Sequence, residues 1–191
     1  MKDEVKQLYL EYISKRRMNP DPEQIGPYFG GFLNGSEILF VGQNFGAPLK
    51  TDNLFMNNIN EYKNDYDSLM TFFEEQWWTS RFGGFLINVL GDLNLYRRDI
   101  SFTNLAIWMT NKNVFPQITK LEYDLFKNEL EIVHPKLIIY LSSTAKSLIE
   151  QNLYNLNCPR MYFAHPASFR YSSDYKTQIV TRIKSTWKKT I

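Results

Sequence analysis

The pattern of apolar and polar positions predicts a chain that alternates between strands and helices. Runs dominated by apolar residues are typical of strands buried on both faces of a sheet, and they occur at 38–41, 100–105, 137–141 and 161–164. Between and around them, apolar residues recur at helical spacing. The predicted helices span 2–17, 69–78, 80–93, 119–133, 143–151 and 174–188.

Capping residues support two of these helices. Ser80 is placed to cap the helix that follows it, and Gly91 lies near that helix's end. Thr119 and Glu122 form a capping-box pattern at the start of another helix. Strands that alternate with helices imply a parallel sheet with helices on both faces. We therefore expect one α/β domain over residues 1–191, a three-layer α/β/α fold with a central four-stranded parallel sheet.

The composition of the chain excludes several kinds of structural and functional site. Cys158 is the only cysteine, which excludes an internal disulfide, a cysteine-rich zinc site and an all-cysteine iron–sulfur cluster within the chain. No apolar run approaches the length that crosses a membrane, and we expect the charged amino-terminal segment to form an amphipathic helix rather than a signal peptide. The net charge of +2 does not by itself indicate nucleic-acid binding. We expect a cytoplasmic monomer without metal or cofactor and without a membrane partner.

Polar residues stand where three of the predicted strands end. Gln43 and Asn44 follow the first strand, Asn104 lies in the second, and His165 follows the fourth. The carboxyl ends of parallel strands share one edge of a sheet, where such folds bind ligands, so these residues predict one pocket. Each also has a structural reading: Asn44 suits a turn, and His165 suits a strand end bonded to backbone. His134 precedes the third strand, at the opposite edge, and is assigned a structural role.

Six segments in this order resemble the uracil-DNA glycosylase superfamily. They are 42–46, 80–90 with 95–105, 131–141, 143–146 and 164–170. The overall pattern is most similar to the thermostable iron–sulfur class, but the cysteines that hold its cluster are absent. The first motif is closer to the classes that contain asparagine at position 44, and Phe45 replaces the usual proline.

The resemblance implies a uracil-DNA glycosylase-like fold and the hydrolysis of the N-glycosidic bond of uracil in DNA during base excision repair. Such an enzyme is monofunctional, needs no cofactor and flips the base out of the duplex before cleavage. The implied catalytic residues are Asn44, which would hold the attacking water through its carbonyl oxygen, and His165, which would donate a hydrogen bond to uracil O2. The partner is DNA that contains uracil.

Further roles follow from the same resemblance. Gln43, Phe55 and Asn104 would bind the base, with Phe55 stacking on the ring and Asn104 reading its edge. Phe45 and Gly46 would line the pocket around the C5 position of the base. Because glycine has no side chain, we expect 5-substituted uracils to be tolerated, unless Phe45 or Phe55 fills the space.

The segment after His165 supplies the implied DNA contact, made by Ser168, Phe169 and Arg170, where an apolar wedge enters the duplex beside a basic residue. A simple loop anchor is the alternative reading of this segment. The sequence leaves a second function open: a glycosylase-fold protein that binds nucleic acid or a base-like ligand with weak catalysis or none. Asn44 in place of a carboxylate and Phe45 in place of proline favour that alternative.

Overall fold

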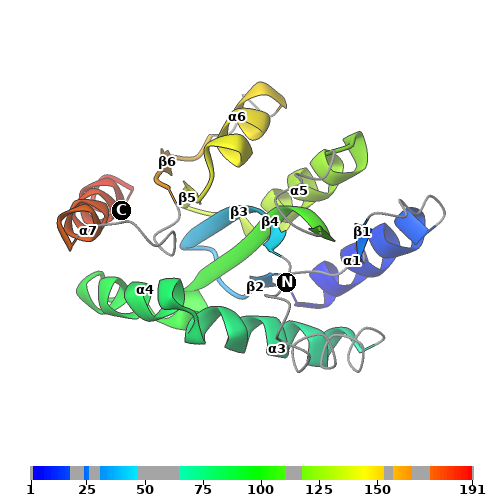
Figure 1. The fold of residues 1–191 in the computed structure, drawn as a ribbon, viewed down its shortest axis with the longest axis horizontal. Helices are drawn as coiled ribbons and strands as arrows, with labels where there is room; N and C mark the ends of the chain where they lie inside the picture. The colour runs from blue at the N-terminus through cyan, green and yellow to red at the C-terminus, as the bar shows by residue number, and fades with distance from the viewer. Residues whose placement is uncertain are drawn as a thin grey trace.

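The computed structural model describes residues 2–17, 24–25, 31–46, 65–110, 118–152, 157–164 and 173–190. Its strands are β1 (Gln24–Ile25), β2 (Phe32–Leu33), β3 (Ile38–Gly46), β4 (Ile100–Thr110), β5 (Leu137–Tyr140) and β6 (Arg160–Tyr162). Its helices are α1 (Lys2–Arg17), α3 (Tyr66–Thr79), α4 (Arg81–Asp92), the 3-10 turn η1 (Arg97–Asp99), α5 (Lys120–Val133), α6 (Ser143–Asn152) and α7 (Ser173–Trp187). From β3 onwards each strand is followed by one or more helices, as the hydrophobic pattern predicts, whereas β1 and β2 precede β3 without a helix between them in the described residues (Figure 1).

The sheet is built around four parallel strands in the order β4-β3-β5-β6. The first of them along the chain, β3, lies between β4 and β5. Its residues Ile38 to Val41 pair with both neighbours, and all four are fully buried. A strand enclosed by two strands and by both helical layers must be apolar throughout, which explains the lack of alternation in this run.

The predicted α/β class is confirmed, but the sheet is six-stranded and mixed rather than four-stranded and purely parallel. The two-residue strands β1 and β2 both pair with β4 in the antiparallel sense. They cover the outer edge of β4, which would otherwise present unpaired backbone groups. Two residues carry no periodic signal, so the hydrophobic pattern did not reveal either strand.

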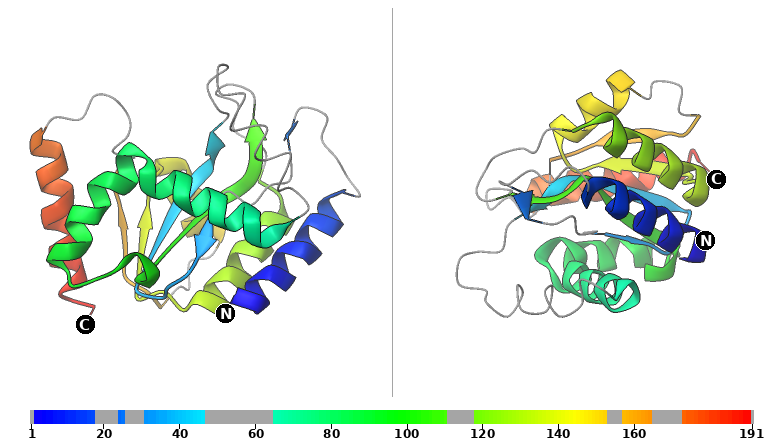
Figure 2. Two further views of the ribbon diagram at one scale, coloured as in Figure 1. Left: turned by 90° about the horizontal axis from the view of Figure 1, so that it is seen from below. Right: turned by 90° about the vertical axis from the view of Figure 1, so that its right-hand side faces the viewer.

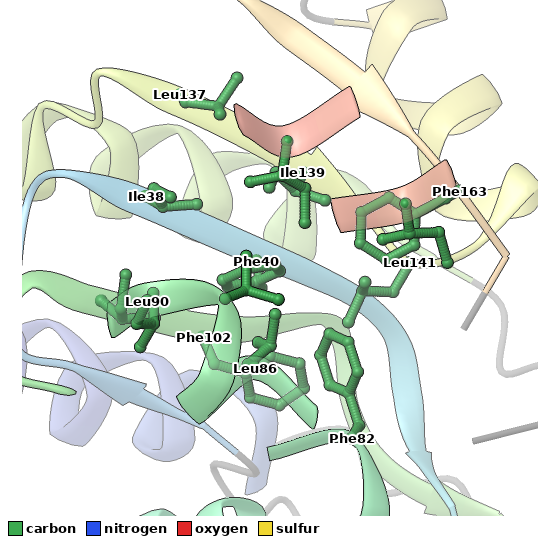
Figure 3. Packing of buried hydrophobic residues seen from close by; sticks show 14 of the residues in the cluster. Ile38, Phe40, Phe82, Leu86, Leu90, Phe102, Leu137, Ile139, Leu141 and Phe163 are labelled. Atoms are coloured by element: carbon green, nitrogen blue, oxygen red, sulfur yellow. The ribbon is translucent and has the colours of Figure 1, made fainter. Parts of the chain in front are cut away.

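Helices cover both faces of the sheet in three layers (Figure 2). On one face α4, α7 and the end of α3 enclose a cluster that includes Phe40, Phe82, Phe102 and Ile139. Figure 3 shows these rings packing against aliphatic side chains of α4 and β5. On the other face α1, α5 and α6 enclose a second cluster around Val41. None of the helices in the described ranges is both long and apolar enough to cross a bilayer.

Local signals place the helix ends as expected. Ser80 Oγ accepts a hydrogen bond from Gly83 N at 3.1 Å and caps α4. The capping box of Thr119 and Glu122 is present at the start of α5. His134 ends α5 in the left-handed conformation, with φ of 47°, and its backbone N–H donates to Leu130 O. His134 therefore has the predicted structural role, far from the carboxyl ends of the strands.

Candidate functional site

The strands β3 and β5 separate near the carboxyl end of β5. Their last pair is Val41 with Tyr140, followed by a hydrogen bond of 2.9 Å from Leu141 N to Val41 O. Beyond this point β3 continues beside β4, whereas the chain after β5 turns into α6. The connections that leave β3 and β5 lead to helices on opposite faces of the sheet. Such a divergence is the switch point at which α/β sheets bind ligands.

Gln43 and Ser142 bridge this switch point. Gln43 is the second residue of β3 beyond its last pair with β5, and Ser142 lies between β5 and α6. Ser142 Oγ donates a hydrogen bond of 2.8 Å to Gln43 Oε1. The same oxygen accepts from the backbone N–H groups of Thr144 and Ala145, at 3.1 and 3.3 Å. The first turn of α6 thereby holds the side chain of Gln43 against the end of β5.

Asn104 lies over Gly42 on the neighbouring strands β4 and β3. The two residues are register partners in the parallel pair. A Cβ atom at position 42 would overlap with Asn104 Oδ1 and would come within 3.3 Å of Phe102 Cζ. A side chain at position 42 would therefore force the carboxamide of Asn104 to move, because this amide occupies the space that a Cβ atom would take. Asn104 itself is only 6% exposed, so its amide is held in a nearly dry setting.

The predicted base-binding residues Gln43 and Asn104 lie on the adjacent strands β3 and β4, but their side chains leave opposite faces of the sheet. The strand that contains Asn104 was predicted to end at residue 105; it continues to Thr110, so Asn104 lies within β4 rather than at its end. Asn104 follows Phe102 on the face of α3 and α4, as its contact with Gly42 shows. Gln43 follows Val41 on the face of α5 and α6, as its bond to Ser142 shows. Asn104 is the register partner of Gly42, and Gln43 is the next residue along β3. Successive side chains of a strand point to opposite faces, so the side chains of Asn104 and Gln43 are separated by the sheet. A ligand that contacts both amides must therefore reach across the end of the strand.

The end of β6 is fixed by the last helix. Ala164 N donates a hydrogen bond of 3.2 Å to the hydroxyl of Tyr175 on α7. Phe163, one residue earlier, is buried, and its N–H donates to Tyr140 O on β5 at 3.2 Å. These two contacts set the position from which the chain continues to His165.

Most of the other predicted site residues lie outside the described part of the chain. Phe55 and His165 do so, as do the three residues of the predicted DNA wedge, Ser168, Phe169 and Arg170. For Asn44, Phe45 and Gly46 the structure gives the backbone alone, as the end of β3. Asn44 pairs with Ala106, and the register with β4 is irregular between Asn44 and Gly46. The predicted glycine-bounded turn thus begins as a strand, because pairing with β4 continues past Gly42.

The hydrophobic pattern did not reveal a buried carboxyl group close to Asn104. Glu129 of α5 is 1% exposed, and Thr103 Oγ1, next to Asn104 on β4, donates to its Oε1 at 3.1 Å. Its other oxygen, Oε2, has no hydrogen-bond partner among the described residues. Burial raises the pKa of the Glu129 carboxyl well above its usual value. Helical spacing contained the signal, because Glu129 follows the buried Leu125 by four residues.

The single cysteine lies far from this edge. Cys158 precedes β6, at the amino ends of the strands, and its Sγ donates to Pro135 O at 3.0 Å. Burial raises the pKa of the Cys158 thiol, so it remains a thiol at neutral pH rather than a reactive thiolate. Among the residues that the structure describes, no three His, Cys, Asp or Glu side chains are grouped to hold a metal ion.

The side chains described at the switch point are neutral donors and acceptors: two carboxamides and a hydroxyl. Such groups suit a neutral, planar ligand that carries carbonyl oxygens and N–H groups on its edges. A scan against models of protein families finds none that matches this chain, and a search of curated proteins finds no significant match.

Proposed function

We propose that the chain is a monofunctional DNA glycosylase with a uracil-DNA glycosylase-like fold, which hydrolyses the N-glycosidic bond of uracil in DNA. The observation that carries the proposal is the packing of the Asn104 carboxamide on Gly42. It joins the first motif to the predicted base-reading residue on the adjacent strands β3 and β4. A nearly buried carboxamide offers a donor and an acceptor in one plane, which matches the O4 and N3–H groups of uracil.

Further support comes from the order of the parallel strands. In the order β4-β3-β5-β6, the strands that contain or precede Asn44, Asn104 and His165 are parallel and run towards one edge of the sheet. Ala164, the residue before His165, is anchored there through Tyr175. A shared strand direction is what a single pocket built from residues far apart in sequence requires.

Each group would act on charge that develops as the bond breaks. The sugar becomes positive and the departing base negative, so fixed dipoles that stabilise both lower the barrier. Asn44 would orient the attacking water through its side-chain oxygen. His165 would donate a hydrogen bond to uracil O2, for which a neutral imidazole suffices. The flipped base would be read by Asn104, and Phe169 with Arg170 would occupy the gap left in the duplex.

An excision assay tests the proposal directly. The purified chain would be incubated with single- and double-stranded oligonucleotides that contain one uracil, and abasic sites would be counted after alkaline cleavage. We expect cleavage at uracil alone and none in matched oligonucleotides that carry thymine. Absence of cleavage on both uracil substrates would refute a glycosylase.

The second candidate is a glycosylase-fold protein that binds a base-like ligand without useful catalysis. The observation that favours it is the first motif, in which Asn44 stands where a carboxylate is found in some classes and Phe45 replaces proline. A carboxamide does not take a proton from water, so catalysis would depend on electrostatics alone. Retained binding of uracil-containing DNA, without cleavage, would select this candidate.

A further inference from the structure

We infer that Ser142 is a positioning residue, which orients the carboxamide of Gln43 so that its NH₂ group is the donor offered to a ligand between β3 and β5. The acceptor is a carbonyl oxygen of the base, and this identification rests on the proposed function. The orientation of Gln43 itself does not, because it follows from hydrogen bonds within the described residues.

The single proton of the Ser142 hydroxyl determines the orientation of the Gln43 amide. A hydroxyl has one proton and two lone pairs. Ser142 Oγ receives N–H groups from Thr144 and Ala145, which use both lone pairs. Its proton must then be donated, and the acceptor is Gln43 Oε1 at 2.8 Å. If the amide were turned over, Nε2 would face the hydroxyl as a third donor, with no lone pair to receive it.

The first turn of α6 therefore determines which end of Gln43 is offered to a ligand. With Oε1 committed to Ser142, the NH₂ group remains, and it has no hydrogen-bond partner among the residues that the structure describes. The positive end of the α6 dipole lies beside this amide and favours an electron-rich oxygen there. A ligand that offers a carbonyl oxygen is accepted, whereas one that offers an N–H group meets a donor.

Substitutions at position 142 separate the cap from the donated proton. In Ser142→Asp the carboxylate still accepts from the helix N–H groups, because Asp is a good N-cap, but it has no proton to give. It attracts the NH₂ group of Gln43 and turns the amide over. Ser142→Thr keeps both the cap and the proton. Ser143→Asp adds the same charge one residue along, on an exposed position of α6, and controls for repulsion of DNA.

The first measurement needs no activity. The side-chain NH₂ signal of Gln43 is followed by nitrogen-15 NMR and assigned by its loss in Gln43→Ala. We expect rapid exchange with water in the wild type, Ser142→Thr and Ser143→Asp, and exchange slower by about tenfold in Ser142→Asp, where the group is bonded. Equal exchange in Ser142→Asp and the wild type would overturn the inference.

The second measurement is a double-mutant cycle on uracil excision. Ser142→Asp should lower kcat/KM by about tenfold in the wild-type background and should have no effect in a Gln43→Ala background, because it acts through Gln43. Equal losses in both backgrounds, or an equal loss in Ser143→Asp, would overturn the inference, as would matching losses in binding to DNA without uracil. If the wild type excises no uracil, the proposed function fails, and the exchange measurement decides the inference by itself.

Discussion

The carboxamide of Asn104 lies against Gly42 so closely that the glycine cannot be exchanged for any other residue without moving the amide. The two positions are paired in register on the parallel strands β4 and β3. The carboxamide of Asn104 thus occupies the space that the absence of a side chain at Gly42 leaves open. Since Asn104 is nearly buried, its amide has little freedom to turn away from this contact.

Gly42→Ala should therefore impair the site while leaving the fold in place. The added methyl group overlaps with Asn104 Oδ1 and forces the amide to shift. Overpacking of this kind costs about 1–3 kcal/mol of stability. We expect uracil excision to fall by about tenfold or more, because a misplaced donor loses its hydrogen bond to the base. Thermal melting and excision kinetics measured on the same preparation check both effects.

Gly84→Ala is the matched control for this change. Gly84 lies on the exposed side of α4, and a Cβ there meets no atom within 4 Å. Alanine in a helix interior stabilises by about 0.5–1 kcal/mol relative to glycine. The control should melt at the same or a higher temperature and keep full activity. Full activity in Gly42→Ala as well would show that Asn104 takes no part in the reaction.

Local patterns in the sequence were enough to predict most of the fold. Ser80 and the pair Thr119 and Glu122 marked helix starts that the structure confirms. The strand that begins at Ile38 was predicted to end at Val41, because the glycine and asparagine residues that follow favour turns. It continues to Gly46, since its pairing with β4 outweighs the local preference.

The contacts of the site were harder to predict because they join residues distant in sequence. Gln43 and Ser142 are separated by 99 positions, and nothing in either local pattern indicates their hydrogen bond. Glu129 is a different case. Its place on the apolar face of α5 was visible, but a glutamate is normally assigned to solvent. Only the position of α5 against Thr103 shows that this carboxyl is buried.

Glu129 should make the stability of the protein depend on pH. Burial raises the pKa of its carboxyl well above 4.5, its usual value. Above pH 4.5 the unfolded chain loses this proton while the folded protein keeps it, so the folded state binds more protons. The free energy of unfolding then falls as pH rises towards the pKa of the folded state. Glu129→Gln removes this titration, so its stability relative to the wild type should increase between pH 5 and pH 8.

Urea unfolding at several pH values checks this prediction. The wild type should lose stability over the interval, and Glu129→Gln should lose less. Thr103→Val tests the local hydrogen bond, since it removes the donor to Oε1 while leaving the carboxyl in place. A constant difference between Glu129→Gln and the wild type at every pH would mean that the folded and unfolded states bind the same number of protons, and so that burial does not raise the pKa of the Glu129 carboxyl.

Asn44→Ala and His165→Ala should each lower uracil excision by roughly 100-fold or more, the scale for the loss of one preorganised electrostatic group. Binding to DNA with uracil should change far less, because both groups act mainly on charge that develops in the transition state. Single-turnover kinetics and fluorescence anisotropy separate the two quantities. Wild-type excision rates in both variants would rule out the assigned roles.

Asn104→Asp should change which pyrimidine is accepted. Uracil presents an acceptor at O4 and a donor at N3, whereas cytosine presents a donor at N4 and an acceptor at N3. An ionised aspartate keeps the acceptor of Asn104 but replaces its donor with a second acceptor, which suits the N4 amine. Each unpaired group in a dry site costs about 1–3 kcal/mol, so uracil excision should fall by about 10- to 100-fold at neutral pH, and weak cytosine excision should appear.

The pH dependence of Asn104→Asp provides a sharper test than the loss alone. Position 104 is nearly buried, and burial favours the neutral form of a carboxyl group. When protonated, the aspartate again offers one donor and one acceptor, like the asparagine it replaces. Uracil excision by the variant should therefore recover, relative to the wild type, as pH falls, while cytosine excision declines. Thermal melting at each pH must show that the variant is folded. A folded variant with wild-type uracil activity at every pH, including alkaline pH, and without cytosine excision would place Asn104 outside the site.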